Sequence, residues 1–257
     1  MTNTRLHDRP GVRQARISEF VVQRGETSVE ALAEKFSTSA ETIRRDLTVL
    51  DAAGQLRKIH GGARAVSDGG EGFFDARMRR NTLAKHLIAE KMAALVKPRQ
   101  TLFMDTGSTT LICAEALAKI KNLTIITNST RIAETFSAGA GGASVYLLGG
   151  LFRGDNAQTV GAGTICEVAN YRADMAILTV GALDAGGAMD FSNQEAMVAR
   201  AMIGAAEHVA VVADHAKLNK RAAFKICALA GIDTFISDRA VSKDLNKALL
   251  DAEVNVV

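Results

Sequence analysis

The stretch E-T-I-R-R-D-L-T-V-L-D-A-A, residues 41–53, restricts the fold of this chain more than any other segment. Its apolar residues recur at spacings of four and three, and so share one stripe of a helix: Ile43, Leu47 and Leu50. Because that stripe must pack on a core, Thr42, Arg44 and Arg45 point away from it. A short basic helix with an open polar face is the kind of element that enters a DNA major groove.

Two helices precede this one in the sequence. Apolar residues at helical spacing predict the first over Arg13–Arg24. In the run T-S-V-E-A-L-A-E-K-F, either Thr27 or Ser28 can cap a second helix, and Glu30 follows Thr27 at the spacing of a capping box.

The polar break S-T-S separates the second helix from the basic one. Thr38 or Ser39 can cap the basic helix, and Glu41 is placed to complete a capping box with Thr38. Two helices joined by about four residues, the second of them basic, are typical of a helix-turn-helix. The run Q-L-R-K-I-H-G-G-A-R-A-V then predicts a hairpin that turns at Gly61 and Gly62, the wing of such a domain.

We expect the basic helix and the wing to contact double-stranded operator DNA. The wing would lie beside the basic helix and meet the sugar-phosphate backbone or a minor groove. The candidate DNA-binding residues are Ser39, Glu41, Thr42, Arg44, Arg45, Arg57, Lys58, His60 and Arg64. The alternative is a three-helix scaffold whose arginines face water. The charge distribution favours DNA, because residues 1–66 hold 11 Lys and Arg against 8 Asp and Glu, whereas residues 67–257 hold 20 of each.

The composition excludes several other classes of protein. The three cysteines are far apart and set among aliphatic residues, which predicts neither a disulfide framework nor a metal site: Cys113, Cys166 and Cys227. No predicted strand is followed by G-x-G-x-x-G, and no cofactor is expected. The chain has no apolar run of about 18 residues, and the segment M-T-N-T-R-L-H-D-R lacks the apolar stretch of an export signal, so we expect a cytoplasmic protein without a membrane partner.

A Gly-rich polar stretch, V-S-D-G-G-E-G, predicts a linker and a domain boundary near residue 70. The expected parts are a DNA-binding domain, a linker with a connecting helix, and a second domain, over residues 1–66, 67–97 and 98–257. The connecting helix is expected over Phe73–Val96, with one apolar side formed by Leu83, Leu87, Ile88 and Met92.

The second domain alternates short apolar runs with helical patterns. The runs are Thr101–Met104, Leu123–Thr127, Val145–Leu148, Met175–Val180, Val209–Ala213 and Thr234–Ser237. Buried strands separated by helices predict an α/β fold with a mostly parallel sheet that is covered on both faces. In such sheets a ligand binds outside the carboxyl ends of the strands.

Polar motifs follow these strands. The strongest, between the first strand and a helix, is D-T-G-S-T-T, formed by Asp105, Thr106, Gly107, Ser108, Thr109 and Thr110. Gly107 would let the backbone turn closely, and the hydroxyls and helix N-terminus would hold a phosphate without a cation. The alternative is an ordinary capped turn.

Further candidates lie at or after the other strand ends: Thr127, Asn128, Gly149, Gly150, Gly181, Asp184, Asp190, Glu195, Asp214 and Lys217. The paired glycines would admit a ligand or form plain turns. Lys217 could reach a bound phosphate or could simply be solvated. The carboxylates after Gly181 could accept hydrogen bonds from the hydroxyls of a polyol.

The motifs T-S-V-E-A-L-A-E-K-F, T-I-R-R-D-L and H-G-G-A resemble the winged helix-turn-helix of the DeoR family of bacterial repressors of carbohydrate catabolism, and the resemblance continues to the C-terminus. It implies a sensor domain similar in fold to ribose-5-phosphate isomerases, with an effector site at Asp105–Thr110, Thr127, Asn128, Gly149, Gly150, Glu195, Asp214 and Lys217. The loop around Asp184 departs from the family's G-I-D-x-x-G pattern, and Leu218 replaces the usual aromatic residue. The D-H-A-K segment favours the glycerol-3-phosphate repressor branch, with a tetritol or pentose phosphate as the alternative effector.

The resemblance implies a repressor of a carbohydrate or polyol catabolic operon that is induced by a phosphorylated sugar or polyol, and not an enzyme. Because operators of this kind are usually paired half-sites, we expect a homodimer or homotetramer. The alternative function is a sugar-phosphate isomerase with an appended DNA-binding domain, for which Asp184, Glu195 and Lys217 are the available groups. The sequence shows no concentrated acid pair, which argues against the enzyme.

Overall fold

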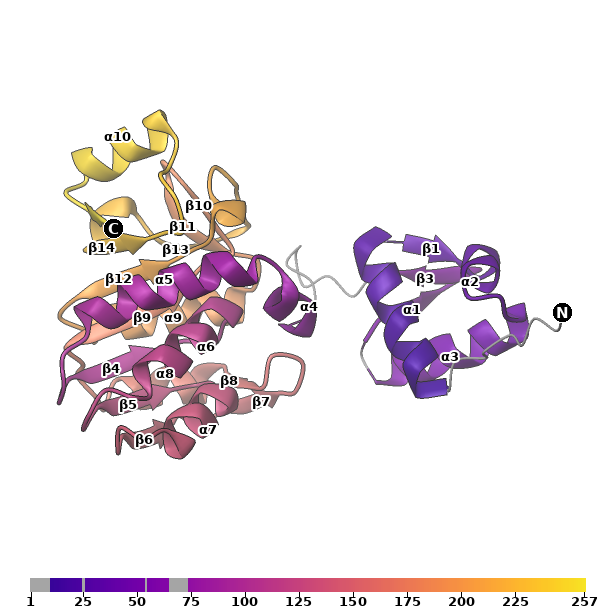
Figure 1. Ribbon diagram of the computed structural model, residues 1–257, viewed down its shortest axis with the longest axis horizontal. Helices are drawn as coiled ribbons and strands as arrows, with labels where there is room; N and C mark the ends of the chain where they lie inside the picture. The colour runs from indigo at the N-terminus through magenta and orange to yellow at the C-terminus, as the bar shows by residue number, and fades with distance from the viewer. Residues whose placement is uncertain (1–9, 25, 54, 65–73) are drawn as a thin grey trace, which may run out of the picture. The chain divides into compact units, whose positions relative to one another are not determined.

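A computed structural model of the chain describes residues 10–24, 26–53, 55–64 and 74–257. The chain divides into two compact units, Met1–Ala76 and Arg77–Val257 (Figure 1). The predicted linker lies outside the described residues, and the three expected domain ranges stay a prediction. Among the residues described, no helix is long and apolar enough to cross a membrane.

The smaller unit is a winged helix-turn-helix built on α1 (Pro10–Arg24), α2 (Val29–Lys35) and α3 (Ala40–Ala52). The apolar stripe predicted for α3 is buried against the other two helices, in a core that includes Ile17, Leu32, Ile43, Leu47 and Leu50. Asp46 of α3 is also buried, and its carboxylate accepts hydrogen bonds from Arg13 and Gln14 of α1. These contacts fix the side of α3 that remains exposed.

The wing contains one more strand than the sequence predicts. Strands β2 (Arg57–Ile59) and β3 (Gly62–Arg64) form the expected antiparallel hairpin, and β1 (Glu26–Ser28) pairs with β3 on its other side. Ser28 caps α2, where its hydroxyl accepts from the Ala31 N–H, and Ser39 caps α3, where its hydroxyl accepts from the Thr42 N–H. The two capping boxes expected from Thr27 and Thr38 are therefore wrong.

The larger unit contains a seven-stranded sheet of order β15-β14-β12-β9-β4-β5-β6, with every neighbouring pair parallel. Its strands are β4 (Thr101–Met104), β5 (Thr124–Thr127), β6 (Ser144–Leu147), β9 (Met175–Thr179), β12 (Val209–Val212), β14 (Thr234–Ile236) and β15 (Asn255–Val256). The six predicted strands are confirmed within one residue at each end; β15 was not predicted. Three further hairpin strands, β10 (Ala182–Asp184), β11 (Gly187–Asp190) and β13 (Phe224–Cys227), form a separate small sheet, and β7 (Leu151–Arg153) pairs with β8 (Gln158–Val160).

The helices of this unit are α4 (Phe74–Arg79), α5 (Thr82–Leu95), α6 (Ser108–Leu117), α7 (Thr130–Ala138), α8 (Ala162–Val168), α9 (Asn193–Gly204) and α10 (Lys243–Asp251), with α4 beginning in the smaller unit. After β4 the chain adds β5 and β6 on one side of the sheet, whereas after β9 it adds β12 and β14 on the other side. The direction of the chain across the sheet therefore reverses between β4 and β9. A crevice at such a reversal, beyond the carboxyl ends of the strands, is where α/β sheets bind ligands.

Three expectations for this unit are wrong. The single helix expected over Phe73–Val96 is broken at Asn81, which has a left-handed backbone and separates α4 from α5. Helix α5 buries Ala84, Ile88 and Met92, whereas Leu83 and Leu87 are exposed. The buried side of α5 thus includes Ala84 and Ala89 in place of the two leucines. The third predicted strand, now β6, is at the sheet edge rather than buried, and its side chains are largely exposed.

Candidate functional site

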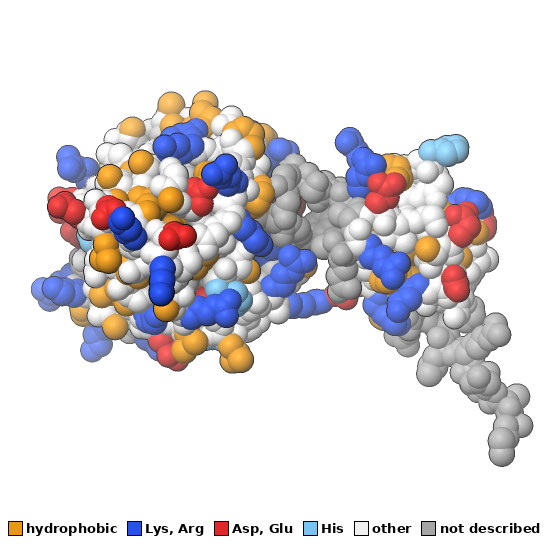
Figure 2. All heavy atoms as spheres, turned by 90° about the horizontal axis from the view of Figure 1, so that it is seen from above, with side chains coloured by type: hydrophobic (Ala, Val, Ile, Leu, Met, Phe, Trp, Pro, Cys, Tyr) orange, Lys and Arg blue, Asp and Glu red, His pale blue; other side chains and the backbone are white. Residues whose placement is uncertain are grey.

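The exposed side of α3 carries the predicted DNA-reading residues. Arg44 and Arg45 have side chains 53% and 80% exposed, and each forms an ion pair with Glu41, at 3.8 and 3.5 Å. Ser39 and Thr42 lie at the start of the helix, where their side chains are hydrogen-bonded to each other. Exposed ion pairs contribute about 0–1 kcal/mol, so a DNA phosphate can replace Glu41 at little cost. Lys and Arg side chains lie on the surface of this unit, interspersed with acidic ones (Figure 2).

The wing presents its basic residues on two different faces. The Lys58 ammonium donates to the Thr48 hydroxyl of α3 at 3.0 Å, so Lys58 lies beside α3 as expected. Arg57 and Arg64 are opposite each other across β2 and β3. Because side chains alternate along a strand, both point to the other face of the hairpin, where Arg64 pairs with Glu26 at 2.7 Å. Arg57 and Arg64 therefore point away from the face that carries Lys58, and their contacts with DNA stay a prediction, while His60 is exposed at the turn.

A small polar pocket lies at the reversal of the seven-stranded sheet. It is lined by Asp105, Thr106, Asn128, Gln158, Asp190, Glu195, Val198 and Ala199. The structure therefore brings together five of the predicted residues, which follow β4 and β5, end β11 or lie on α9: Asp105, Thr106, Asn128, Asp190 and Glu195. The cavity volume is about 10 Å³, which is room for about one water molecule. In this conformation the pocket is too small for a sugar phosphate.

The loop after β4 is held by contacts within the protein. Both carboxylate oxygens of Asp105 accept from the Thr179 N–H, at 3.0 and 3.1 Å, and the Thr110 hydroxyl donates to the carbonyls of Asp105 and Gly107. Gly107 has an ordinary extended backbone, and a Cβ there would lie 2.2 Å from Thr179 Cγ2. Gly107 thus admits Thr179 rather than a ligand, and Thr110 is not a spare donor. Ser108 and Thr109 are buried in the first turn of α6.

Asp190 and Glu195 form an acid pair in the pocket. Burial raises the pKa of Asp190 to about 7, and repulsion from Glu195 adds to this shift. Burial likewise raises the pKa of Glu195, although its Oε1 accepts from Gln158 at 2.9 Å and from Asn156 at 3.1 Å. Burial also raises the pKa of Asp105 well above its usual value. The expectation that the chain has no concentrated acid pair is wrong.

Arg77 of α4 supplies positive charge beside these carboxyl groups. Its Nη2 donates to Asn156 Oδ1 at 2.8 Å, and Asn156 in turn donates to Glu195. Burial lowers the pKa of Arg77, while the charges of Glu195 and Asp190 oppose that shift. Sequence reasoning missed Arg77, Asn156 and Gln158. Nothing in the run F-D-A-R-M-R-R distinguishes the arginine that becomes buried.

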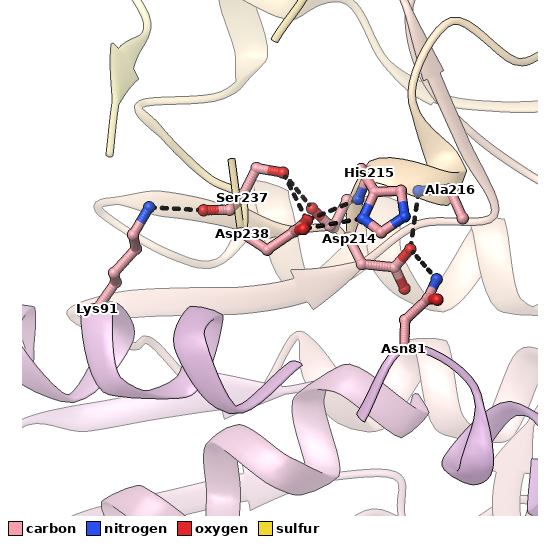
Figure 3. Close-up of polar contacts among 8 residues, drawn as sticks. Asn81, Lys91, Asp214, His215, Ala216, Ser237 and Asp238 are labelled. Atoms are coloured by element: carbon pink, nitrogen blue, oxygen red, sulfur yellow. Dashed lines mark hydrogen bonds and ion pairs between the residues drawn. The ribbon is translucent and has the colours of Figure 1, made fainter. Parts of the chain in front are cut away.

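Asp214 lies in a second polar cluster, after β12 (Figure 3), and Lys217 follows it in the chain. The Asp214 carboxylate accepts from the Asn81 side chain at 2.9 Å and from the Ala216 N–H at 2.8 Å. Through the second bond Asp214 caps the short helix His215–Lys217. His215 Nδ1 and Asp238 are hydrogen-bonded at 2.8 Å. Burial lowers the pKa of Lys217 to about 8. Neither Asp214 nor Lys217 lines the pocket, so the predicted effector residues divide between two clusters.

The remaining predicted effector residues serve the fold and do not line the pocket. The Thr127 hydroxyl donates to the Met104 carbonyl, and the Gly149 N–H donates to Glu167. A Cβ on Gly150, where φ is +139°, would lie 2.0 Å from the Thr164 hydroxyl, and one on Gly181 would lie 2.7 Å from the Phe191 ring. Asp184 forms an ion pair with Arg221 at 2.9 Å. These glycines admit protein groups rather than a ligand.

Two family models match the chain. One, described as a DeoR-like helix-turn-helix domain, matches residues 13–68, and the other, described as a DeoR C terminal sensor domain, matches residues 80–239. Similar proteins include the HTH-type transcriptional repressor CsqR of Escherichia coli (31% identity, 100% of this chain and 98% of the relative) and the glycerol-3-phosphate regulon repressor of the same organism (31%, 93% and 95%). The transcriptional repressor AccR of Agrobacterium fabrum is 33% identical over 88% of each chain.

Solved structures match more weakly. Ribose-5-phosphate isomerase A of Methanocaldococcus jannaschii is 16% identical, with a TM-score of 0.41 over 55% of this chain and 56% of the isomerase. The eIF2B beta protein of Chaetomium thermophilum is 12% identical, with a TM-score of 0.47 over 95% of this chain and 69% of that chain.

Proposed function

Because the chain belongs to the DeoR family of transcriptional repressors, we propose that it represses a carbohydrate or polyol catabolic operon and leaves its operator when a phosphorylated sugar or polyol binds the larger unit. One observation supports this proposal above the others. The same chain contains a basic helix with exposed Arg44 and Arg45 and a parallel sheet with a polar pocket where its strand order reverses. A repressor acts on chromosomal DNA, so its place is the cytoplasm.

For DNA, we assign the major-groove contacts to the exposed side of α3. Arg44 and Arg45 are the candidates for guanine or phosphate contacts, since a guanidinium suits both. Lys58, held beside α3 by Thr48, is a candidate for the adjacent backbone. His60 fits the same role from the tip of the wing. Arg57 and Arg64 lie on the far face of the hairpin and would contribute mainly through long-range attraction.

For the effector, the pocket favours hydroxyl groups over the phosphate. Three carboxyl groups line it and none of its lining residues is a lysine or arginine, so the pocket offers a phosphate no cation among them. A sugar or polyol hydroxyl can instead donate to Asp190 or Glu195 and accept from Asn128 or Gln158. Lys217, which follows Asp214 of the second cluster in the chain, is the candidate for the phosphate. This division replaces the expectation that Asp105–Thr110 hold the phosphate.

Induction requires an effector that favours a state with weaker DNA affinity. The pocket has room for about one water molecule, so a sugar phosphate enters only if the surrounding side chains move. Arg77 lies on α4, the first described element after residues 65–73, and is tied to Glu195 through Asn156. An effector that replaces the hydrogen bonds of Asn156 or Glu195 would break the link from Glu195 through Asn156 to Arg77 of α4. We assign α4, rather than a continuous connecting helix, as the transmitter.

An isomerase activity is the second candidate, because Asp190 and Glu195 provide the acid pair that the sequence did not reveal. A carboxyl group with a pKa near 7 can serve as a general base. The similar proteins are named as repressors, which favours regulation.

The test is a thermal-shift screen of the full chain with phosphorylated sugars and polyols, each compared with its unphosphorylated counterpart. A ligand at 100 times its Kd stabilises the folded state by about 2.7 kcal/mol. We expect one phosphorylated compound to raise the melting temperature and to release DNA taken from the region flanking the coding sequence. Steady conversion of that compound to an isomer would favour the enzyme, and failure to retain any such DNA would refute the repressor.

A further inference from the structure

The edge strand β6 has backbone groups that point away from the sheet. Ser144 and Leu148 donate their N–H groups to carbonyls at the two ends of β5. Because the backbone groups of a strand alternate between its two sides, the N–H and C=O groups of Val145 and Leu147 point to the open edge. Within the described part of the chain, no strand pairs with this edge.

The side chains at this edge are apolar and uncharged. Tyr146 and Leu147 are 48% and 46% exposed, and Leu151 and Phe152 of the following strand β7 are 57% and 56% exposed. Residues 144–152 contain no charged side chain. Proteins usually protect exposed edges with lysines, prolines, bulges or a covering segment, since an open edge is a template for another strand. This segment contains neither a charged residue nor a proline that would protect the edge.

We propose that β6 pairs with β6 of a second copy of this chain, antiparallel about a two-fold axis. A strand without charge can pair with itself because no like charges come into opposition. Antiparallel pairing of one strand with its own copy is two-fold symmetric, as a closed dimer requires. The proposal rests on the proposed repressor function in one respect: a repressor that binds paired half-sites needs two copies of α3.

The outward-facing groups fix the register of this pairing. Val145 of one copy lies opposite Leu147 of the other, so that both outward residues exchange hydrogen bonds with the second strand. Tyr146 then lies on the two-fold axis, opposite its own copy, as a non-hydrogen-bonded pair with Cα atoms about 4.5 Å apart. The two seven-stranded sheets become one continuous sheet across the dimer.

The register is tested by cross-linking the full chain. A cysteine at position 146 would face its own copy at a Cα distance within the range of about 4.4–6.8 Å that a disulfide bridges. We expect Tyr146→Cys to give a covalent dimer under mild oxidation. The controls are the unchanged chain, which reports any cross-linking through the exposed Cys166, and Leu250→Cys, which places a thiol on the exposed side of α10. Cross-linking of Tyr146→Cys no greater than that of both controls would overturn the register and the proposal.

Sedimentation of the full chain tests the interface without a new thiol. We expect the unchanged chain to be a dimer or tetramer, and Leu147→Lys to raise the dissociation constant of the β6 interface on the order of tenfold or more, because two lysines replace two apolar side chains. Leu250→Lys, at a position 60% exposed, is the matched control and should leave the mass unchanged. A monomeric unchanged chain, or equal masses for Leu147→Lys and the control, would overturn the proposal. Neither experiment uses DNA or effector, so its failure is distinct from failure of the repressor function.

Discussion

Replacement of Asp190 by asparagine tests the charge balance of the pocket. The pKa of Asp190 is about 7 in the folded chain against 3.8 for an ordinary aspartate, and a difference of about three units at 1.36 kcal/mol per unit amounts to about 4 kcal/mol. Asp190 titrates together with Glu195, so part of this free energy belongs to the pair, and about 2–4 kcal/mol is the expected range.

The sign follows from the direction of the shift. Between pH 3.8 and about 7 the folded chain keeps a proton on Asp190 that the unfolded chain has lost, so the free energy of unfolding falls as the pH rises through this window. Asparagine has no proton to lose and retains an oxygen for the Ser192 N–H that Asp190 now accepts at 2.8 Å. We therefore expect Asp190→Asn to match the unchanged chain near pH 4 and to be more stable by about 2–4 kcal/mol at pH 8.

The assay is urea unfolding at several pH values, followed by tyrosine fluorescence. The chain has no tryptophan and two tyrosines, Tyr146 and Tyr171, both in the larger unit, so the signal reports that unit alone. Asp184→Asn is the control, because it removes a carboxylate that is paired with Arg221 and should give no gain at pH 8. Equal pH dependence of the unchanged chain and Asp190→Asn would refute the raised pKa of Asp190.

Four other predictions concern DNA and effector binding. Alanine at both Arg44 and Arg45 should abolish operator retention in a gel shift while the melting temperature stays unchanged, whereas Arg172→Ala, an exposed arginine of the larger unit, should retain the operator. Operator affinity should fall steeply with salt, and replacing these two arginines should lessen the slope of its logarithm by about one for each DNA phosphate that they neutralise; a flat response would contradict phosphate binding. Arg77→Lys keeps the charge but not the planar donor set, so we expect operator binding to persist and the inducer response to weaken; an unchanged response would remove α4 as the transmitter. Lys217→Gln should raise the apparent Kd of a phosphorylated ligand, measured by thermal shift, more than tenfold. An equal rise for its unphosphorylated counterpart would show that Lys217 does not bind the phosphate.

Local patterns in the sequence determined most of the secondary structure. The stripe of Ile43, Leu47 and Leu50 fixed which side of the basic helix is exposed, and six short apolar runs gave six strands of a parallel sheet. These predictions succeed because periodicity and capping act between residues a few positions apart. The errors have a tertiary cause. Leu83 and Leu87 have the apolar character of core residues, but Ala84 and Ala89 are buried in their place and the leucines are exposed.

The sequence by itself determined the fold class, the amphipathic basic helix α3, and the position of polar loops at the carboxyl ends of the strands. Only the tertiary structure decided which polar groups meet: Asp190 and Glu195 with Asn156 and Arg77 in one cluster, and Asp214 with Asn81 in another. It also decided that the third strand is an open edge. The physical reason is that burial, pKa and unpaired backbone groups depend on neighbours far apart in the chain, which no local pattern specifies.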